Sequence, residues 1–116
     1  MRHRKKKATL GRERAQRKAL MRSLAESLIL HDAIVTTKSK AKALRVFVEP
    51  LVTKARKNRP IDKEMIQKTL YTAKAFNRLV KEIAPRYENR PGGYTRIIKL
   101  GLRQGDKSEK VKIEFV

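Results

Sequence analysis

The sequence contains no cysteine and no tryptophan, and aromatic residues make up 5% of its 116 residues. Without cysteine there are no disulfides, thiolate metal sites or cysteine nucleophiles. So few aromatic rings argue against a surface that binds single-stranded nucleic acid mainly by base stacking. Runs free of charged residues reach about five residues, whereas a membrane-spanning helix needs roughly 20, and no apolar segment follows the basic N-terminus as in a secretory signal. We therefore expect a soluble, intracellular chain.

Acidic residues are also scarce. The chain has 11 Asp and Glu against 31 Lys and Arg, which gives a net charge of +20. So much charge of one sign repels itself when the chain compacts, and a polyanionic partner would compensate for it. At this length one compact domain is expected, and 40% hydrophobic residues are enough for a core. The same repulsion argues against a homo-oligomer.

Residues that carry catalysis or bind metals are few. His3 and His31 lie far apart in the sequence, and neither has a pair of carboxylates at ligand spacing. The stretch Gly101–Ser108 superficially resembles a phosphate-binding loop, but its glycine spacing is one residue short and a strand pattern follows it. We therefore expect no enzyme, no cofactor and no metal site.

Positive charge is concentrated at the N-terminus. Ten of the first 22 residues are Lys or Arg, and Glu13 is the one acidic residue among them. Residues 1–7 carry no apolar side chain after Met1, so burial cannot offset the entropy of ordering them. The sequence predicts a basic arm over residues 1–10, which orders on a phosphate backbone, and a single α/β domain over residues 11–116.

A first helix is predicted to begin near Thr9 or Gly11 and to end near His31 and Asp32. Its first turns are rich in cations, which oppose the helix dipole there and so point to a partner outside the chain. The apolar residues at helical spacing are Leu20, Leu24 and Leu28, with Ala15, Ala19 and Met21 beside them. The β-branched stretch Ala33–Thr37 then predicts a short strand.

A second helix is predicted from its apolar spacing, with Thr37 or Ser39 as its N-cap and a kink near Glu49, because Pro50 lies inside it. Its apolar face comprises Leu44, Phe47, Val48, Leu51, Val52 and Ala55.

Residues 61–84 form one helix or two with a break near Thr72, and Pro85 is expected to end the region. The candidates for burial there are Met65, Ile66, Thr69, Leu70, Phe76, Leu79, Val80 and Ile83.

Two strands are predicted at the C-terminal end, over residues 94–103 and 110–116, joined by a hairpin turn at residues 104–108. In the second of them Val111, Ile113 and Phe115 alternate with polar residues. The predicted fold class is therefore α+β, a two-layer arrangement. Its order is helix, strand, three helices and two strands, with a small three-stranded mixed sheet.

Nucleic acid is the expected polyanion, and the sequence motifs help to separate its classes. Zinc fingers need cysteine, and no aromatic pair of the kind used by RNA-recognition sheets is present. Cations spread over the arm, helices, loop and strand are typical of a protein embedded in folded RNA. Composition alone also allows a DNA protein that packs a nucleoid. An RNA-processing enzyme has no support in the sequence.

Several segments resemble the L-seventeen family of bacterial large-subunit ribosomal proteins, in order along the whole chain. The N-terminal segments are Met1–Lys5, Leu10–Arg12, Arg17–Ala25, Ile34–Lys42 and Glu49–Thr53. The C-terminal segments are Ala84–Tyr87, Arg90–Ile97, Lys99–Gly101, Arg103–Asp106 and Ile113–Val116.

The resemblance implies a non-catalytic constituent of the large ribosomal subunit in the cytoplasm. It implies partners in large-subunit rRNA, near the polypeptide exit tunnel, and in neighbouring ribosomal proteins, and it implies RNA contacts in four groups. The arm supplies Arg2, His3, Arg4, Lys5, Lys6 and Lys7. The first helix supplies Arg12, Arg14, Arg17, Lys18 and Arg22. The strand–helix junction supplies Thr36, Thr37, Lys38, Lys40 and Lys42. The loop before the hairpin supplies Arg90, Gly92, Gly93, Tyr94 and Arg96. Gly92 and Gly93 either let RNA approach the backbone or make a turn.

Overall fold

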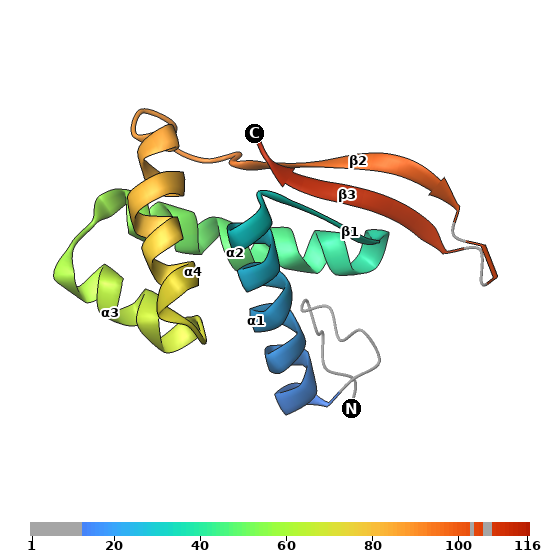
Figure 1. The fold of residues 1–116 in the computed structure, drawn as a ribbon, viewed down its shortest axis with the longest axis horizontal. Coiled ribbons are helices and arrows are strands. Elements are labelled where there is room, and N and C mark those ends of the chain that lie inside the picture. Colours follow the sequence, from blue (N-terminus) through green and yellow to red (C-terminus); the bar gives the residue numbers. More distant parts are fainter. Residues whose placement is uncertain (1–12, 103, 106–107) are drawn as a thin grey trace, which may run out of the picture.

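A computed structural model describes residues 13–102, 104–105 and 108–116. Its elements are α1 (Arg14–His31), β1 (Ala33–Thr37), α2 (Lys38–Lys57), α3 (Pro60–Thr69), α4 (Ala73–Arg78), the π-helix η1 (Leu79–Ile83), the 3-10 helix η2 (Ala84–Tyr87), β2 (Thr95–Leu102) and β3 (Glu109–Phe115). The helices and the small sheet form an α+β fold, as predicted (Figure 1). Among the described residues, no helix is both long enough and apolar enough to span a bilayer.

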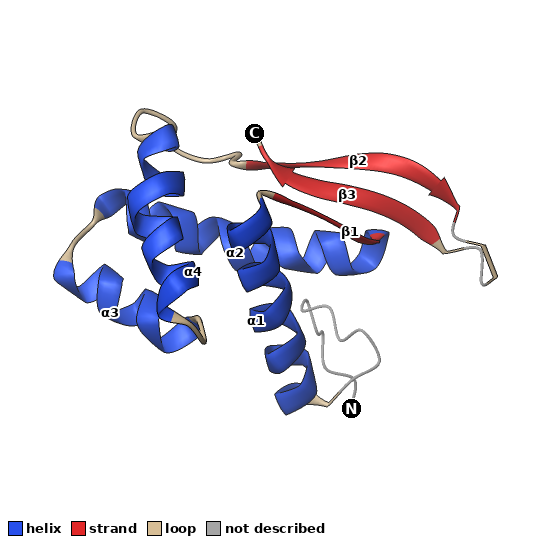
Figure 2. Ribbon diagram, viewed as in Figure 1, coloured by secondary structure: helices blue, strands red, loops and turns tan. Residues whose placement is uncertain are grey.

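The sheet has the order β1-β3-β2, and both pairings are antiparallel. The predicted mixed sheet is therefore wrong. The central strand is β3, so β1 and β2 both run opposite to it and are never hydrogen-bonded to each other (Figure 2). Alternation along β3 indicated correctly which side chains face the core, but it carries no information about which strand lies between the other two.

One face of the sheet packs on α2. Ile113 at the centre of β3 is fully buried and pairs with Ile34 of β1 and Ile97 of β2. The predicted apolar face of α2 lies against this layer: Phe47 is half-buried, and Leu44, Val48, Leu51, Val52 and Ala55 are buried. The β2–β3 hairpin extends beyond the N-terminus of α2 (Figure 1). The free end of this hairpin therefore has no helix beneath it.

The boundaries of α1, β1 and α2 largely follow the predictions. His31 ends α1, and Asp32 is its C-cap in the left-handed conformation, with φ of 66°. Ala33–Thr37 is the predicted strand, and Thr37 rather than Ser39 caps α2. Pro50 lies within a continuous α2. Helix α1 begins at Arg14, later than expected, because Glu13 is still in an extended conformation.

The sequence left open whether residues 61–84 form one helix or two. The structure has a break between α3 and α4, so they form separate helices. Leu70 ends α3 in an extended conformation, and the Thr72 side chain caps α4 by accepting a hydrogen bond from the Ala75 backbone. Two expectations for this region are wrong. Met65 is 45% exposed rather than buried, and Pro85 does not end the helical region, since it lies within η2, which follows η1 directly.

Candidate nucleic-acid interface

The N-terminal half of α1 extends beyond the core. The buried residues of α1 begin at Met21, and residues 13–20 are exposed or half-buried. This half carries Arg14, Arg17 and Lys18, and no acidic residue lies in its first turn. Both the helix dipole and the side chains therefore make this end of α1 positive, which favours an anionic partner. The expected apolar stripe is accordingly incomplete: Leu20 and Leu24 are half-buried, and Ala15 and Ala19 are exposed.

At the junction between β1 and α2, two of the predicted RNA-binding residues contact other groups of the same chain. The Thr37 side chain accepts a hydrogen bond from the Lys40 backbone at 3.4 Å, and Lys38 Nζ lies 3.2 Å from Glu109 Oε2. Lys42 is exposed, and Lys40 and Thr36 are half-buried. Since the first turn of α2 contains no acidic residue, this helix end also remains positive.

The loop before β2 corrects one prediction. Tyr94 is fully buried, so its side chain cannot contact RNA directly. Its ring centroid lies 5.1 Å from that of Tyr87, and its hydroxyl is 3.1 Å from Thr53 Oγ1 and accepts a hydrogen bond from Arg56 Nη1 at 3.0 Å. Tyr94 therefore fastens the loop to α2. From the residues alone, core packing was the favoured use of Tyr87 and Tyr94, and both are buried; only the resemblance assigned Tyr94 to RNA.

The other members of the loop set lie at the surface, with the exception of half-buried Gly92. Arg90 is exposed and its carbonyl accepts a 2.6 Å hydrogen bond from Arg56 Nη1, while Arg96 on the outer face of the sheet lies 3.3 Å from Glu114. Gly93 has φ of +65°, a value that a turn demands and that side chains oppose, whereas Gly92 has no positive φ. This left-handed conformation favours glycine at position 93, and it is compatible with either a turn or a close approach of RNA.

Arginines that the sequence did not single out hold the fold together. Arg78 and Arg86 both donate to Asp32 Oδ1 at 3.1 Å, and Arg78 also donates to the Ile29 carbonyl at 2.5 Å. Burial raises the pKa of Asp32, but the hydrogen bonds and charges of Arg86 and Arg78 outweigh it and hold that pKa below its usual value. These two arginines therefore stabilise the junction between α1 and β1.

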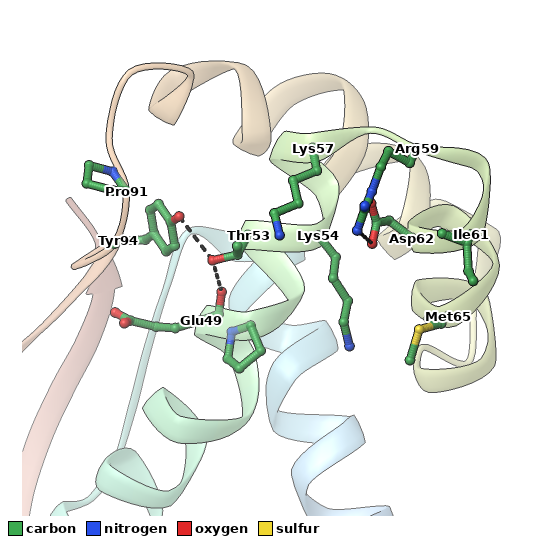
Figure 3. A pocket seen from close by; sticks show the side chains of 12 residues that line it. Glu49, Thr53, Lys54, Lys57, Arg59, Ile61, Asp62, Met65, Pro91 and Tyr94 are labelled. Atoms are coloured by element: carbon green, nitrogen blue, oxygen red, sulfur yellow. Dashed lines mark hydrogen bonds and ion pairs between the residues drawn. The ribbon is translucent and has the colours of Figure 1, made fainter.

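A groove of about 610 Å³ lies between the C-terminal half of α2, the start of α3 and the loop before β2 (Figure 3). Lys54, Lys57 and Arg59 line it, with Asp62 held by Arg59 at 2.7 Å. Hydrogen bonds from Arg59 lower the pKa of Asp62. Sequence reasoning did not single out this cluster as a site: its cations lie within six residues of one another, but only the fold places Pro91, Gly92 and Tyr94 from the loop before β2 beside them to form a groove.

The predicted RNA-binding residues do not gather into one patch. The N-terminal ends of α1 and α2 and the loop before β2 lie in different parts of the molecule (Figure 1). Arg2, His3, Arg4, Lys5, Lys6, Lys7 and Arg12 lie outside the described residues. Within the described residues, no group of three or more His, Asp or Glu side chains is arranged to hold a metal ion.

Comparison with known proteins decides the family. The model of the family described as ribosomal protein L17 matches residues 20–116. The chain belongs to the ribosomal protein L17 family. It is 47% identical over its whole length to the large ribosomal subunit protein bL17 of Gemmatimonas aurantiaca, covering 98% of that protein. It is also 47% identical to the bL17 protein of Salinibacter ruber, of which it spans 59%.

Membership of the L17 family confirms the resemblance seen in the sequence. This is a family of structural ribosomal proteins, so the prediction that the chain is not an enzyme is confirmed as well. The cationic surfaces described above are therefore those of a ribosomal protein.

Proposed function

We propose that the chain is an architectural component of the large ribosomal subunit that binds large-subunit rRNA through several separate cationic surfaces. Its relatives from Gemmatimonas aurantiaca and Salinibacter ruber are named as large-subunit proteins. The observation on this chain that carries the RNA part is its net charge of +20. A phosphate backbone supplies the compensating charge, and release of its counterions drives binding.

The placement of the acidic side chains supports this proposal. At least eight of the ten acidic residues in the described part of the chain are held by other groups of the same chain. They are Glu26, Asp32, Glu49, Asp62, Glu64, Glu82, Glu109 and Glu114. Because these carboxylates already neutralise or bond internal partners, the field outside the protein is dominated by Lys and Arg, and phosphates meet little local repulsion.

The separation of the cationic surfaces indicates how the protein would recognise RNA. A protein that reads a nucleic-acid sequence concentrates its contacts on one element that enters a groove of the duplex. Here the positive N-terminal ends of α1 and α2 lie in different parts of the molecule, and the cationic groove is lined by the opposite, C-terminal half of α2. Contacts in several directions fit the shape of a folded RNA, with affinity from phosphates and specificity from the arrangement of its helices.

Family membership also supports a more specific location, close to the polypeptide exit tunnel and beside other large-subunit proteins. A site-directed probe can test it, since the chain contains no cysteine. An exposed residue such as Glu88, changed by Glu88→Cys, gives a unique attachment point for an iron chelate that cleaves nearby RNA. We expect cleavage of rRNA segments that surround the exit of the tunnel; cleavage confined to other segments would contradict this location.

The RNA-binding function is tested by sedimentation of the tagged chain from cell lysate, before and after a high-salt wash. We expect the chain to sediment with the large subunit and to remain there after the wash. Competition between large-subunit rRNA and duplex DNA for the purified chain provides the second readout. Loss from the subunit together with equal affinity for the two nucleic acids would favour the nucleoid alternative instead.

A further inference from the structure

Tyr71 differs from every other aromatic residue in the protein by its exposure. All six aromatic residues lie in the described part of the chain, and Tyr71 is 56% exposed. Tyr87, Tyr94 and Phe115 are buried, and Phe47 and Phe76 are half-buried against the core. A singly exposed tyrosine is ordinary at a protein surface, so the groups held around this ring decide what it can bind.

The backbone that carries this ring is held in place by a buried carboxylate. Glu26 of α1 is 9% exposed, and its Oε2 accepts hydrogen bonds from the backbone N–H groups of Tyr71 and, at 3.1 Å, of Thr72. Its Oε1 also accepts a hydrogen bond from the Thr72 hydroxyl at 3.2 Å. The linker between α3 and α4 is thereby fixed to α1. The ring of Tyr71 is presented from a rigid base, so little entropy is lost when it binds a ligand.

Arg22 of α1 covers part of the ring. Its Cζ lies 5.3 Å from the centroid of Tyr71, within the range of a cation–π contact. Its Nε is buried and has no hydrogen-bond partner among the described residues. The contact between Arg22 and Tyr71 does not serve only to join α1 to the linker. It leaves the ring mostly exposed and leaves the buried Nε donor without a hydrogen bond in the described part of the chain. The exposed part of the Tyr71 ring, with a guanidinium beside it, therefore retains unused binding capacity, whereas the buried Nε is not accessible to a ligand.

A row of cations leads to this point. Arg14, Lys18 and Arg22 are spaced i, i+4 and i+8 along α1, so they lie on one face of the helix, about 6 Å apart along its axis. Arg14 and Lys18 are exposed. Cations that follow a backbone, next to an aromatic ring that stacks on a base, form the arrangement by which proteins hold unpaired nucleotides.

We propose that Tyr71 and Arg22 form a stacking site for one unpaired base of RNA, and that Lys18 and Arg14 bind the phosphates of the adjoining nucleotides. This inference rests on the proposed RNA-binding function and specifies one of its contacts. The base lies against the accessible surface of the Tyr71 ring, opposite or beside the Arg22 guanidinium. Fully paired RNA cannot use the site, because its bases are stacked within the helix.

The experiment uses the full chain and a single-stranded oligoribonucleotide that contains one 2-aminopurine, with the matched fully paired duplex as a second ligand. Fluorescence of the 2-aminopurine reports stacking, and anisotropy reports affinity. We expect Tyr71→Phe to bind the single strand like the parent chain. Tyr71→Ser should weaken single-strand binding roughly 10-fold, leave duplex binding unchanged and abolish the stacking signal. Arg22→Lys keeps the charge but removes the planar group, and should reduce the stacking signal.

Two controls separate stacking from folding and from general charge. Tyr71→Leu keeps an apolar side chain; it should melt like the parent chain and lose the stacking signal nonetheless. Lys110→Gln removes one exposed charge from the sheet, away from Tyr71, and should weaken both RNAs equally. If the parent chain binds both RNAs and Tyr71→Ser or Tyr71→Leu keeps the full stacking signal, the stacking site is overturned while RNA binding stands. If the parent chain binds neither RNA, the proposed function falls, and the stacking site with it.

Discussion

At the residue scale, buried and half-buried carboxylates accept hydrogen bonds from backbone N–H groups of connecting segments, although the chain has few acidic residues. Glu26 holds the linker before α4, and Glu49 of α2 accepts hydrogen bonds from the backbone and the hydroxyl of Thr95, at 3.2 and 2.9 Å, where β2 begins. In both cases a helix supplies the acceptor for backbone N–H groups that no ladder or helix satisfies. Removing such an acceptor leaves buried donors without a partner, which costs more than the bond itself.

Glu26→Ala tests this role directly. We expect the variant to lose about 2–3 kcal/mol of its free energy of unfolding, because the N–H groups of Tyr71 and Thr72 lose their shared acceptor. Urea denaturation followed by circular dichroism measures the change. Glu64→Ala is the matched control, since Glu64 forms an exposed pair with Lys68 at 3.5 Å and its removal should cost less than about 0.5 kcal/mol. Equal losses in the two variants would contradict a special role for Glu26.

Single residues also show where sequence reasoning reached its limit. Tyr71 and Tyr94 both lie in segments that connect helices or strands. Tyr94 is nevertheless fully buried, whereas Tyr71 is 56% exposed. The difference arises because Thr53 and Arg56 of α2 bond the hydroxyl of Tyr94, whereas α1 contacts Tyr71 through Glu26 at its backbone and through Arg22 at its ring. These contacts join residues more than 35 positions apart, so no local pattern carries them. Charge and apolar spacing could be read from the sequence, whereas the use of each ring could not.

At the scale of elements, periodicity predicted what depends on local spacing. The apolar face of α2, the strand Ala33–Thr37 and the alternation in β3 all follow from which residues can share a buried face. The central position of β3 and the π-helix η1 did not follow. Strand order depends on pairing between distant segments, and the five-residue π-helix η1 departs from the α-helical period of about 3.6 residues per turn.

The junction between α1 and β1 makes a second prediction, about pH. Asp32 caps α1, its carbonyl accepts a hydrogen bond from the Phe115 backbone at 3.1 Å, and its carboxylate binds Arg78 and Arg86. Its pKa in the folded protein lies below the value of about 3.9 found in unfolded chains. The stabilisation is therefore present above about pH 4 and is lost as pH falls through that value towards the folded pKa. We expect the urea midpoint to fall between pH 5 and pH 3, two values chosen to bracket this range.

Asp32→Asn should flatten part of that fall, because an amide does not titrate. Asn adopts the left-handed conformation readily, so the cap geometry with φ of 66° is preserved. Asp62, whose pKa is also lowered, accounts for part of the remaining dependence. Glu88→Gln, at an exposed site in the loop after η2, is the control and should follow the parent curve. A parent-like curve for Asp32→Asn would show that the ion pairs with Arg78 and Arg86 contribute nothing to acid stability.

At the scale of the whole molecule, positive charge is left uncompensated on several surfaces. Carboxylates are used within the fold, and cations occupy helix ends, a groove and the outer face of the sheet, so the compact state carries an uncompensated field. A single cationic face would be compensated by one RNA helix. In the proposed complex, RNA on several sides compensates for these cations, and in its absence mobile ions do so, so stability and binding should both respond to ionic strength.

The arm sequence makes the last prediction, since Arg2, Arg4, Lys5, Lys6 and Lys7 bring five positive charges to one end of the chain. If each displaces a counterion from RNA, deletion of residues 2–7 should lower the slope of log affinity against log salt by up to about 4. Titration of large-subunit rRNA at several salt concentrations measures the slope, and replacement of the five cations by Gln separates charge from chain length. We expect both variants to lose the same part of the slope, while the urea midpoint in the absence of RNA is maintained. An unchanged slope would place the arm outside the interface and leave the helix ends and the groove as the surfaces that bind phosphate.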